Sequence, residues 1–379
     1  MIVATFLCML LFAPPAAAPT VEPVTSVVPF PRGLALHDGT LYVLARGRVR
    51  GAGGVDAGLD DMAGTLFAVD PDGDDPTTNG VVVARPTDPP FHLLDRTMDP
   101  VDETRTDRPY CTLRFDPATQ SFYLCAFSGI DGQGTAFRKN ASDAVLRYDL
   151  RTRRWYEVAR HAGGWDYAEA QPKGPNNCLV IGRWLYVVGK DNHMLVRHDL
   201  TPLRADPEGD AGPATLVFGD MLRLADGSTE TVQGHSALAV RDGYLYVGFR
   251  TSGQIIRVRL DDDEPARPVV AEVVARFPAW DPIAGTSADI TDIGFDPDGR
   301  LYVINAQPAR IHRFRPDPTD VYDGGLSQPW VNLAETLGKP TLKAENLLVA
   351  DDGSVFVTTG DPYGRDDGLG GVVYRVREG

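Results

Sequence analysis

The sequence of 379 residues has little cysteine, no excess of positive charge and no long apolar stretch after its first residues. Its four cysteines include no CxxC pair with the spacing of a zinc site. Lys and Arg number 37 against 52 Asp and Glu, and a net charge of −15 argues against a nucleic-acid-binding surface. GxSxG, HExxH and P-loop motifs are also missing, so no common catalytic or nucleotide-binding signature assigns an activity.

The one long apolar run lies at the N-terminus. Residues 1–18 read MIVATFLCMLLFAPPAAA and end in small residues, which predicts a signal peptide and a secreted or periplasmic protein. The run lacks a basic start, so the cleavage site does not follow from it. No later segment approaches the roughly 20 apolar residues that a membrane helix needs. No linker divides residues 19–379, and we expect one domain, without a membrane span, that is a monomer.

Three cysteines remain after the leader. Cys111 and Cys125 flank a predicted turn at residues 116–120, and would therefore lie nearly opposite each other in an antiparallel hairpin. A cross-strand disulfide between them is compatible with an oxidising compartment. The alternative is that both, together with Cys178, are small buried hydrophobic residues.

One unit recurs along the chain: an apolar strand, a short turn, and an apolar strand with a central aromatic residue. The copies are GLALHDGTLYVLA at residue 33, CTLRFDPATQSFYLCA at 111, NCLVIGRWLYVVG at 177, SALAVRDGYLYVGF at 236, DIGFDPDGRLYVIN at 292 and ENLLVADDGSVFVTT at 345. The aromatic markers are Tyr42, Tyr123, Tyr186, Tyr246, Tyr302 and Phe356. Third strands follow each hairpin, and weaker fourth strands are visible. Four short strands in each of six units predict an all-β fold, the six-bladed β-propeller.

Five of the third strands carry an arginine at the same position: Arg147, Arg197, Arg257, Arg313 and Arg375. We expect these arginines to be structural residues that bridge neighbouring blades.

The two ends of the chain complement each other. The sixth unit has only three strands, whereas residues 22–30, EPVTSVVPF, resemble a strand with no hairpin of its own. We expect this N-terminal strand to complete the last blade and close the ring, which removes a free sheet edge.

The longest loops are expected on one face of the ring, and we predict a small-molecule or glycan ligand there. The aromatic and acidic residues of these loops are suited to binding a sugar-like ligand. Alternatively, the aromatic residues pack the loops onto the blades and the acids face solvent. Substrate-binding candidates on this face are Arg46, Lys190, Arg250 and Asp361. The three cations could bind an anionic group, or could instead pair with Asp361 and the other loop acids.

A second set of polar residues is expected where the first strand of each unit meets the axis. The six places hold Arg32, Cys111, Asn176, Ser236, Thr291 and Glu345, with Asn177, Asp292 and Asn346 adjacent. Asn176, Asp292 and Glu345 carry the oxygen ligands that Ca²⁺ prefers, and Asp289 could replace Asp292. His235, just before the fourth unit, is the histidine best placed for acid–base catalysis together with Glu345.

The hairpins GLALHDGTLYV, DIGFDPDGRLYV and ENLLVADDGSVFVT resemble those of six-bladed propellers of the NHL-repeat, strictosidine-synthase-like and gluconolactonase/regucalcin families. The last family holds an axial divalent ion with a Glu, an Asn and an Asp. GPNNCLVIGRWLYV, with Asn176, resembles its Asn segment, and Asp292 and Glu345 match its acids. The resemblance implies a metal-dependent hydrolase of lactones or small esters. Asn177 stands where a Gly is usual, and the Glu comes from the last unit.

Two other functions remain open from the sequence. The segment VFVTTGDPYGRDDGLGGVVYRV, from Val355, resembles one blade of the quinoprotein sugar dehydrogenases, which implies an oxidoreductase. A non-catalytic propeller that binds a glycan or a protein is the third interpretation, since a fold does not determine a function.

Overall fold

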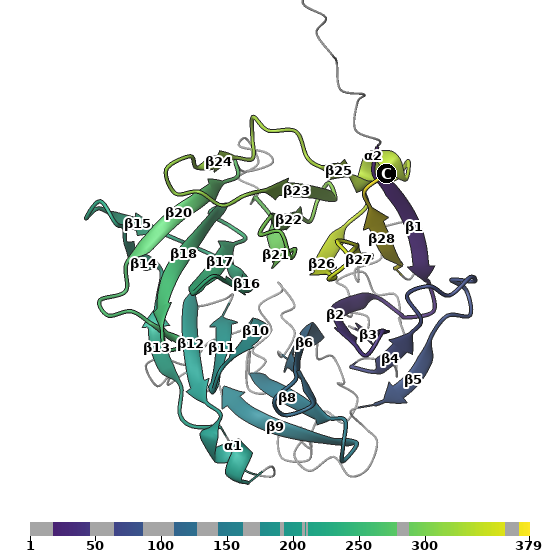
Figure 1. The fold of residues 1–379 in the computed structure, drawn as a ribbon, viewed down its shortest axis with the longest axis horizontal. Coiled ribbons are helices and arrows are strands. Elements are labelled where there is room, and N and C mark those ends of the chain that lie inside the picture. The colour runs from purple at the N-terminus through teal and green to yellow at the C-terminus, as the bar shows by residue number, and fades with distance from the viewer. Residues whose placement is uncertain are drawn as a thin grey trace, which may run out of the picture.

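The computed structural model describes residues 18–45, 64–85, 110–126, 143–161, 175–189, 193–206, 209, 211–278, 288–360 and 371–379. Within them the chain is nearly all β, and six blades surround one central axis (Figure 1). The structure therefore confirms the predicted six-bladed propeller. Helices in these ranges are confined to α1 (Thr201–Ala205) and α2 (Leu333–Thr336), and neither has the length to cross a bilayer.

The first three blades take their strands in chain order from the axis outward. Blade 1 contains β2 (Pro31–His37), β3 (Thr40–Ala45), β4 (Leu66–Val69) and β5 (Val81–Ala84), and blade 2 contains β6 (Tyr110–Asp116), β7 (Ser121–Ala126), β8 (Asp143–Asp149) and β9 (Arg154–His161). Blade 3 contains β10 (Pro175–Ile181), β11 (Trp184–Gly189), β12 (Met194–Asp199) and β13 (Thr215–Phe218). The hairpin of β14 (Met221–Arg223) and β15 (Thr229–Thr231) follows as a separate sheet.

The other three blades each show a departure from four consecutive strands. Blade 4 contains β16 (His235–Arg241), β17 (Tyr244–Phe249), β18 (Gln254–Asp261) and β20 (Ala271–Arg276), with β19 (Glu264–Pro265) beside β18 and β24 (Tyr322–Asp323) parallel to β20. Blade 5 contains β21 (Ile290–Phe295), β22 (Leu301–Asn305), β23 (Arg310–Phe314) and the two-residue β25 (Val331–Asn332). Blade 6 contains β26 (Ala344–Val349), β27 (Val355–Thr359), β28 (Val373–Arg377) and β1 (Thr20–Thr25).

The N-terminal strand closes the ring as expected, although it occupies Thr20–Thr25 and is shorter than residues 22–30. β1 pairs antiparallel with β28, with Glu22 opposite Arg375. Val24 is buried, and the Glu22 carboxylate accepts a hydrogen bond from Arg375 at 2.5 Å. Residues from both ends of the chain therefore share one blade (Figure 1). Residues 1–17, the core of the predicted signal peptide, lie outside the described residues.

The six marker aromatics occupy one place of the second strand, as the repeat predicts. Tyr186, for example, lies opposite Leu179 on one side and Arg197 on the other, and five of the six markers face the third-strand arginines. The expected bridging between blades holds for Arg197, Arg313 and Arg375. They pair with Glu264 of blade 4, Glu378 after blade 6 and Asp72 of blade 1, respectively. Arg257 instead binds Glu272 within its own blade at 2.6 Å.

Candidate functional site at the propeller axis

Every inner strand begins with a β-bulge, and these bulges determine which side chains reach the axis. In blade 3, Pro175 lies opposite Gly189 and Asn177 opposite Val188, so Asn176 is the extra residue. The same irregularity occurs in the other five inner strands. By this register the extra residues are Arg32, Asn176, Ser236 and Thr291. In blades 2 and 6 two residues face one, and by analogy with the other blades Thr112 and Glu345 are the extra residues. Bulges re-aim side chains and are common beside active sites.

This register corrects one position of the ring expected from the sequence. In blade 2 the axial place belongs to Thr112, because Cys111 pairs directly with Cys125 at the first rung of the hairpin. Thr112 has a positive φ of 54° and donates a hydrogen bond to Asn177 Oδ1 at 3.0 Å. The sequence prediction placed Cys111 here, one residue too early, because the bulge leaves no signal in the sequence.

Glu345 lies in a cluster of three charged side chains, which we name the mouth cluster: Arg32, Lys343 and Glu345. Arg32 Nη1 forms an ion pair with Glu345 Oε2, and Lys343 Nζ lies 3.3 Å from Oε1. Arg32 and Glu345 are both buried, whereas the Lys343 side chain keeps 15% of its surface exposed. Burial alone would lower the pKa of Arg32, but the charge of Glu345 and the hydrogen bond to it raise the pKa above its ordinary value. The two cations favour the ionised form of the carboxylate.

Asp292 is the centre of a second group, which we name the axial network: Arg114, Asn177, Asp292 and Asn346. Its carboxylate is fully buried and accepts hydrogen bonds from the side chains of the other three members, at 2.8 to 3.1 Å. The backbone N–H groups of Ile293 and Leu347 also donate to it. Because the donors come from blades 2, 3, 5 and 6, one carboxylate connects four blades across the axis.

The residues expected to hold Ca²⁺ lie near the axis, but both of their carboxylates have other partners. Glu345 faces two cations, and both Asp292 oxygens accept hydrogen bonds. Asn176 donates its amide Nδ2 to the Ser236 carbonyl at 3.3 Å. The described residues contain no group of three His, Cys, Asp or Glu side chains arranged for a metal ion. In this arrangement the set does not fit a divalent cation, which needs several free oxygen ligands.

The side chain of His235 is packed among aromatic rings. Its ring packs against Phe249 with a centroid distance of 4.7 Å and against Phe218 at 5.6 Å, and it is completely buried. Desolvation, together with the nearby His193, lowers the pKa of His235 to about 3. The imidazole is therefore neutral at physiological pH and is enclosed between blades 3 and 4.

Arg250, the one substrate-binding candidate within the described residues, forms an ion pair with Asp289. Arg46, Lys190 and Asp361 lie outside the described residues, as do the aromatic residues of the long loops. The residues after Gly360 that carry the sugar-dehydrogenase resemblance are likewise outside until Gly371. Arg114 and Lys343 were missed by sequence reasoning, because neither lies at the repeat positions that mark the axis.

The three cysteines after the leader are buried free thiols. Cys111 and Cys125 lie directly opposite each other, which agrees with the hairpin geometry expected from the sequence. Burial raises the pKa of Cys125 well above its ordinary value, and the neighbouring Cys178 raises it further. All three pack in the core between blades 2 and 3.

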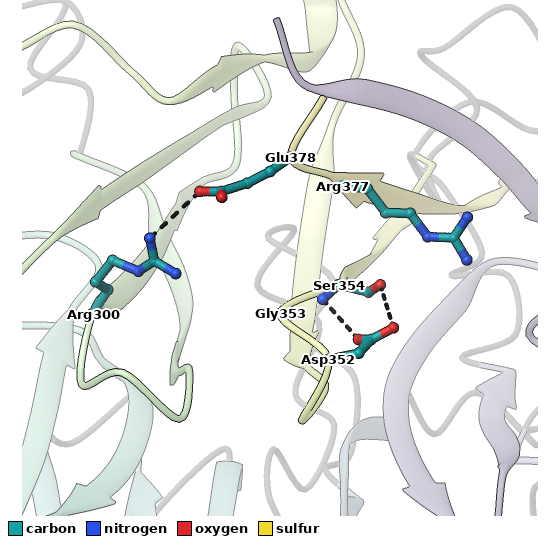
Figure 2. A pocket seen from close by; sticks show the side chains of 6 residues that line it. All are labelled: Arg300, Asp352, Gly353, Ser354, Arg377 and Glu378. Carbon is teal, nitrogen blue, oxygen red and sulfur yellow. Dashed lines mark hydrogen bonds and ion pairs between the residues drawn. The ribbon is translucent and has the colours of Figure 1, made fainter. Parts of the chain in front are cut away.

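Away from the axis, a pocket of about 240 Å³ lies between blades 5 and 6, lined by Arg300, Asp352, Gly353, Ser354, Arg377 and Glu378 (Figure 2). Its residues belong to the turns that follow β21 and β26 and to the C-terminal end of β28. Arg300 already pairs with Asp296 and Asp298, and Asp352 accepts hydrogen bonds from Ser354. Small-molecule sites are usually larger, at roughly 300–1,000 Å³.

No family model matches the chain, and no curated protein matches it by sequence. Its fold is similar to that of the soluble aldose sugar dehydrogenase of Escherichia coli, at 12% identity over 96% of this chain and 100% of that chain, with a TM-score of 0.52. A luciferin-regenerating enzyme is 12% identical over 95% of both chains, with a TM-score of 0.52. The calcium-binding protein regucalcin of Agrobacterium tumefaciens is 11% identical over 96% of this chain and 94% of that chain, with a TM-score of 0.50. These likenesses support the propeller fold alone.

Proposed function

We propose that the protein is an enzyme that hydrolyses a small lactone or ester at the mouth cluster. The observation that carries this proposal is the buried Glu345 carboxylate, held between Arg32 and Lys343 at the start of an inner strand. Buried charges are costly and perturb their surroundings, so a charged cluster at a protein's centre is a candidate functional site.

The proposed reaction uses groups of this chain. A water molecule attacks the carbonyl carbon and gives a proton to the Glu345 carboxylate, which then returns it to the leaving alkoxide as the ester C–O bond breaks. The partly exposed Lys343 ammonium stabilises the negative charge that develops on the carbonyl oxygen. Arg32 positions Glu345 through their ion pair. His235 takes no part, because its imidazole is buried among aromatic rings.

The sequence predicted a calcium ion at Asn176, Asp292 and Glu345, but the Asp292 and Glu345 carboxylates have cationic partners in the structure, so no step of the proposed reaction passes through a metal ion. Substrate contacts by Arg46, Lys190, Arg250 and Asp361 on the long-loop face stay predictions, as do export and the monomeric state.

The test is a hydrolysis assay on a panel of sugar lactones and small aryl esters. We expect the wild-type protein to hydrolyse at least one of them and Glu345→Gln to reduce kcat/KM by about 10²–10⁴-fold, the usual contribution of a general base. Glu230→Gln is the matched control, because Glu230 pairs with Arg276 on the outer part of blade 4. Thermal unfolding of each variant verifies the fold.

No hydrolysis of any panel member by the wild-type protein would contradict the proposed function. Equal rates for the wild-type protein and a folded Glu345→Gln variant would contradict the assignment of Glu345, even if hydrolysis occurs. If Glu345→Gln does not fold, Lys343→Met serves instead, since it keeps the Arg32–Glu345 ion pair and removes only the partly exposed cation.

A further inference from the structure

We propose that Arg32 and Arg114 are built-in cations of the propeller axis, so that Glu345 and Asp292 need no divalent metal ion. The two acids lie on adjacent blades and are 2% and 0% exposed. Acids this deeply buried are rarely found without a compensating charge. Each here has an arginine partner: Arg32 for Glu345, and Arg114 for Asp292 at 2.8 Å.

The arrangement of donors around Asp292 supports this inference. Asn177 and Asn346 present their Nδ2 atoms to the carboxylate, each at 3.1 Å, whereas a metal ligand would present its amide oxygen. Two backbone N–H groups complete a set of five donors around the two oxygens. Within this set only Asn346 Oδ1 is a buried oxygen without a hydrogen-bond partner, whereas a hard cation such as Ca²⁺ needs about six to eight oxygen ligands.

The charge balance leads to the same conclusion. The mouth cluster and axial network contain two carboxylates and three cations: Arg32, Arg114 and Lys343. The net charge of these groups is already positive. Adding a divalent ion would place two further positive charges among them, in an interior of low dielectric constant. An arginine remains charged at every accessible pH and cannot be removed by a chelator.

The first test uses the wild-type protein and does not depend on any activity. We expect metal analysis after dialysis to find no stoichiometric divalent ion, and the melting temperature to be unchanged by EDTA or by millimolar CaCl₂. One divalent ion per chain, or a lower melting temperature in EDTA, would overturn the proposal. Since neither readout measures hydrolysis, its outcome is independent of the proposed function.

The second test removes one built-in cation. Arg114→Met keeps the aliphatic stem and leaves the buried Asp292 charge uncompensated, so we expect a lower melting temperature that CaCl₂ partly restores. Arg300→Met is the matched control, because its acid, Asp296, is also buried but lies away from the axis at a turn. CaCl₂ should not stabilise this control.

A melting temperature of Arg114→Met equal to that of the wild-type protein would overturn the proposal, as would an equal response of both proteins to CaCl₂. If Arg114→Met does not fold, Arg114→Lys keeps the positive charge and should remain folded and insensitive to EDTA. The proposal would be contradicted if Arg114→Lys folded only when CaCl₂ was added.

Discussion

Asp292 is the single residue on which the centre of the ring depends most. Its carboxylate joins four blades and is fully buried. We expect Asp292→Asn to lower the free energy of unfolding by about 3–5 kcal/mol, because Arg114 loses its partner and an amide N–H then faces other donors. Urea unfolding measures the change.

The control for this prediction is Asp38→Asn, at a turn where the side chain is exposed and only 3.4 Å from His37. Its effect should stay below about 0.5 kcal/mol. A similar loss in both variants would mean that the axial network contributes no more than a surface contact.

His235 gives a prediction for pH. Its pKa is about 3 in the folded protein, below the ordinary value of 6.5, so the unfolded chain binds more protons between these pH values. The free energy of unfolding should therefore fall as pH decreases from 6.5 towards 3, by up to about 1.4 kcal/mol per pH unit from this residue. His312, with a pKa of about 4, acts in the same direction.

His235→Leu should make that slope shallower, measured by urea unfolding at several pH values between 7 and 4. An unchanged slope would show that the buried imidazole does not contribute to acid sensitivity.

Which residues approach the axis could be predicted only in part. The repeat correctly indicated Arg32, Asn176, Ser236, Thr291 and Glu345, because each lies at the start of its hairpin or directly before it. The partners of the acids could not be predicted. Arg114 reaches Asp292 from the opposite side of the ring, and no spacing within the sequence encodes a contact between residues 178 positions apart. For the same reason, the sequence predicted that Asp292 and Glu345 offer free oxygen ligands to Ca²⁺, whereas their carboxylates form ion pairs in the structure.

The contact between the first two inner strands depends on a glycine. A Cβ atom added at Gly33 would lie 2.6 Å from the backbone nitrogen of Leu113 in β6, so β2 and β6 could not approach as closely. We expect Gly33→Ala to destabilise the protein by roughly 1–3 kcal/mol, the usual cost of overpacking.

Gly80→Ala is the control for this prediction, because its Cβ atom would make only ordinary contacts with Val27 at 3.5 Å. Its unfolding free energy should stay within about 0.5 kcal/mol of the wild-type value, and equal losses in both variants would contradict the argument from close approach.

Strands were easier to predict than their irregularities. Alternating apolar residues and the aromatic marker located the hairpins, because a half-buried strand must repeat every second residue. The bulges, the short β25 and the parallel addition of β24 to blade 4 depend on contacts with other elements. Because local sequence patterns contain no information about these contacts, the sequence did not predict these features.

Closure of the ring is a property of the whole molecule. β1 covers the edge of β28, buries Val24 and provides Glu22 to Arg375. We expect a chain that begins at Ser26 to lose on the order of 3–5 kcal/mol of stability, because the contacts of the buried Val24 and the partly buried Val21 disappear together with the pairing of β1. The exposed edge of β28 should also promote association.

Thermal unfolding and size-exclusion chromatography measure both effects, with a chain that begins at Ala18 as the control. Equal melting temperatures for the two chains would mean that β1 does not hold the ring closed.

The proposed hydrolysis takes place at the axial mouth of the ring, and a crystal structure with a bound sugar acid, the product expected from a sugar lactone, tests this proposal most directly. We predict that the acid lies on the axis within hydrogen-bond distance of Lys343 and Glu345. A sugar acid bound only in the pocket between blades 5 and 6 (Figure 2), or elsewhere on the outer surface, would contradict the account.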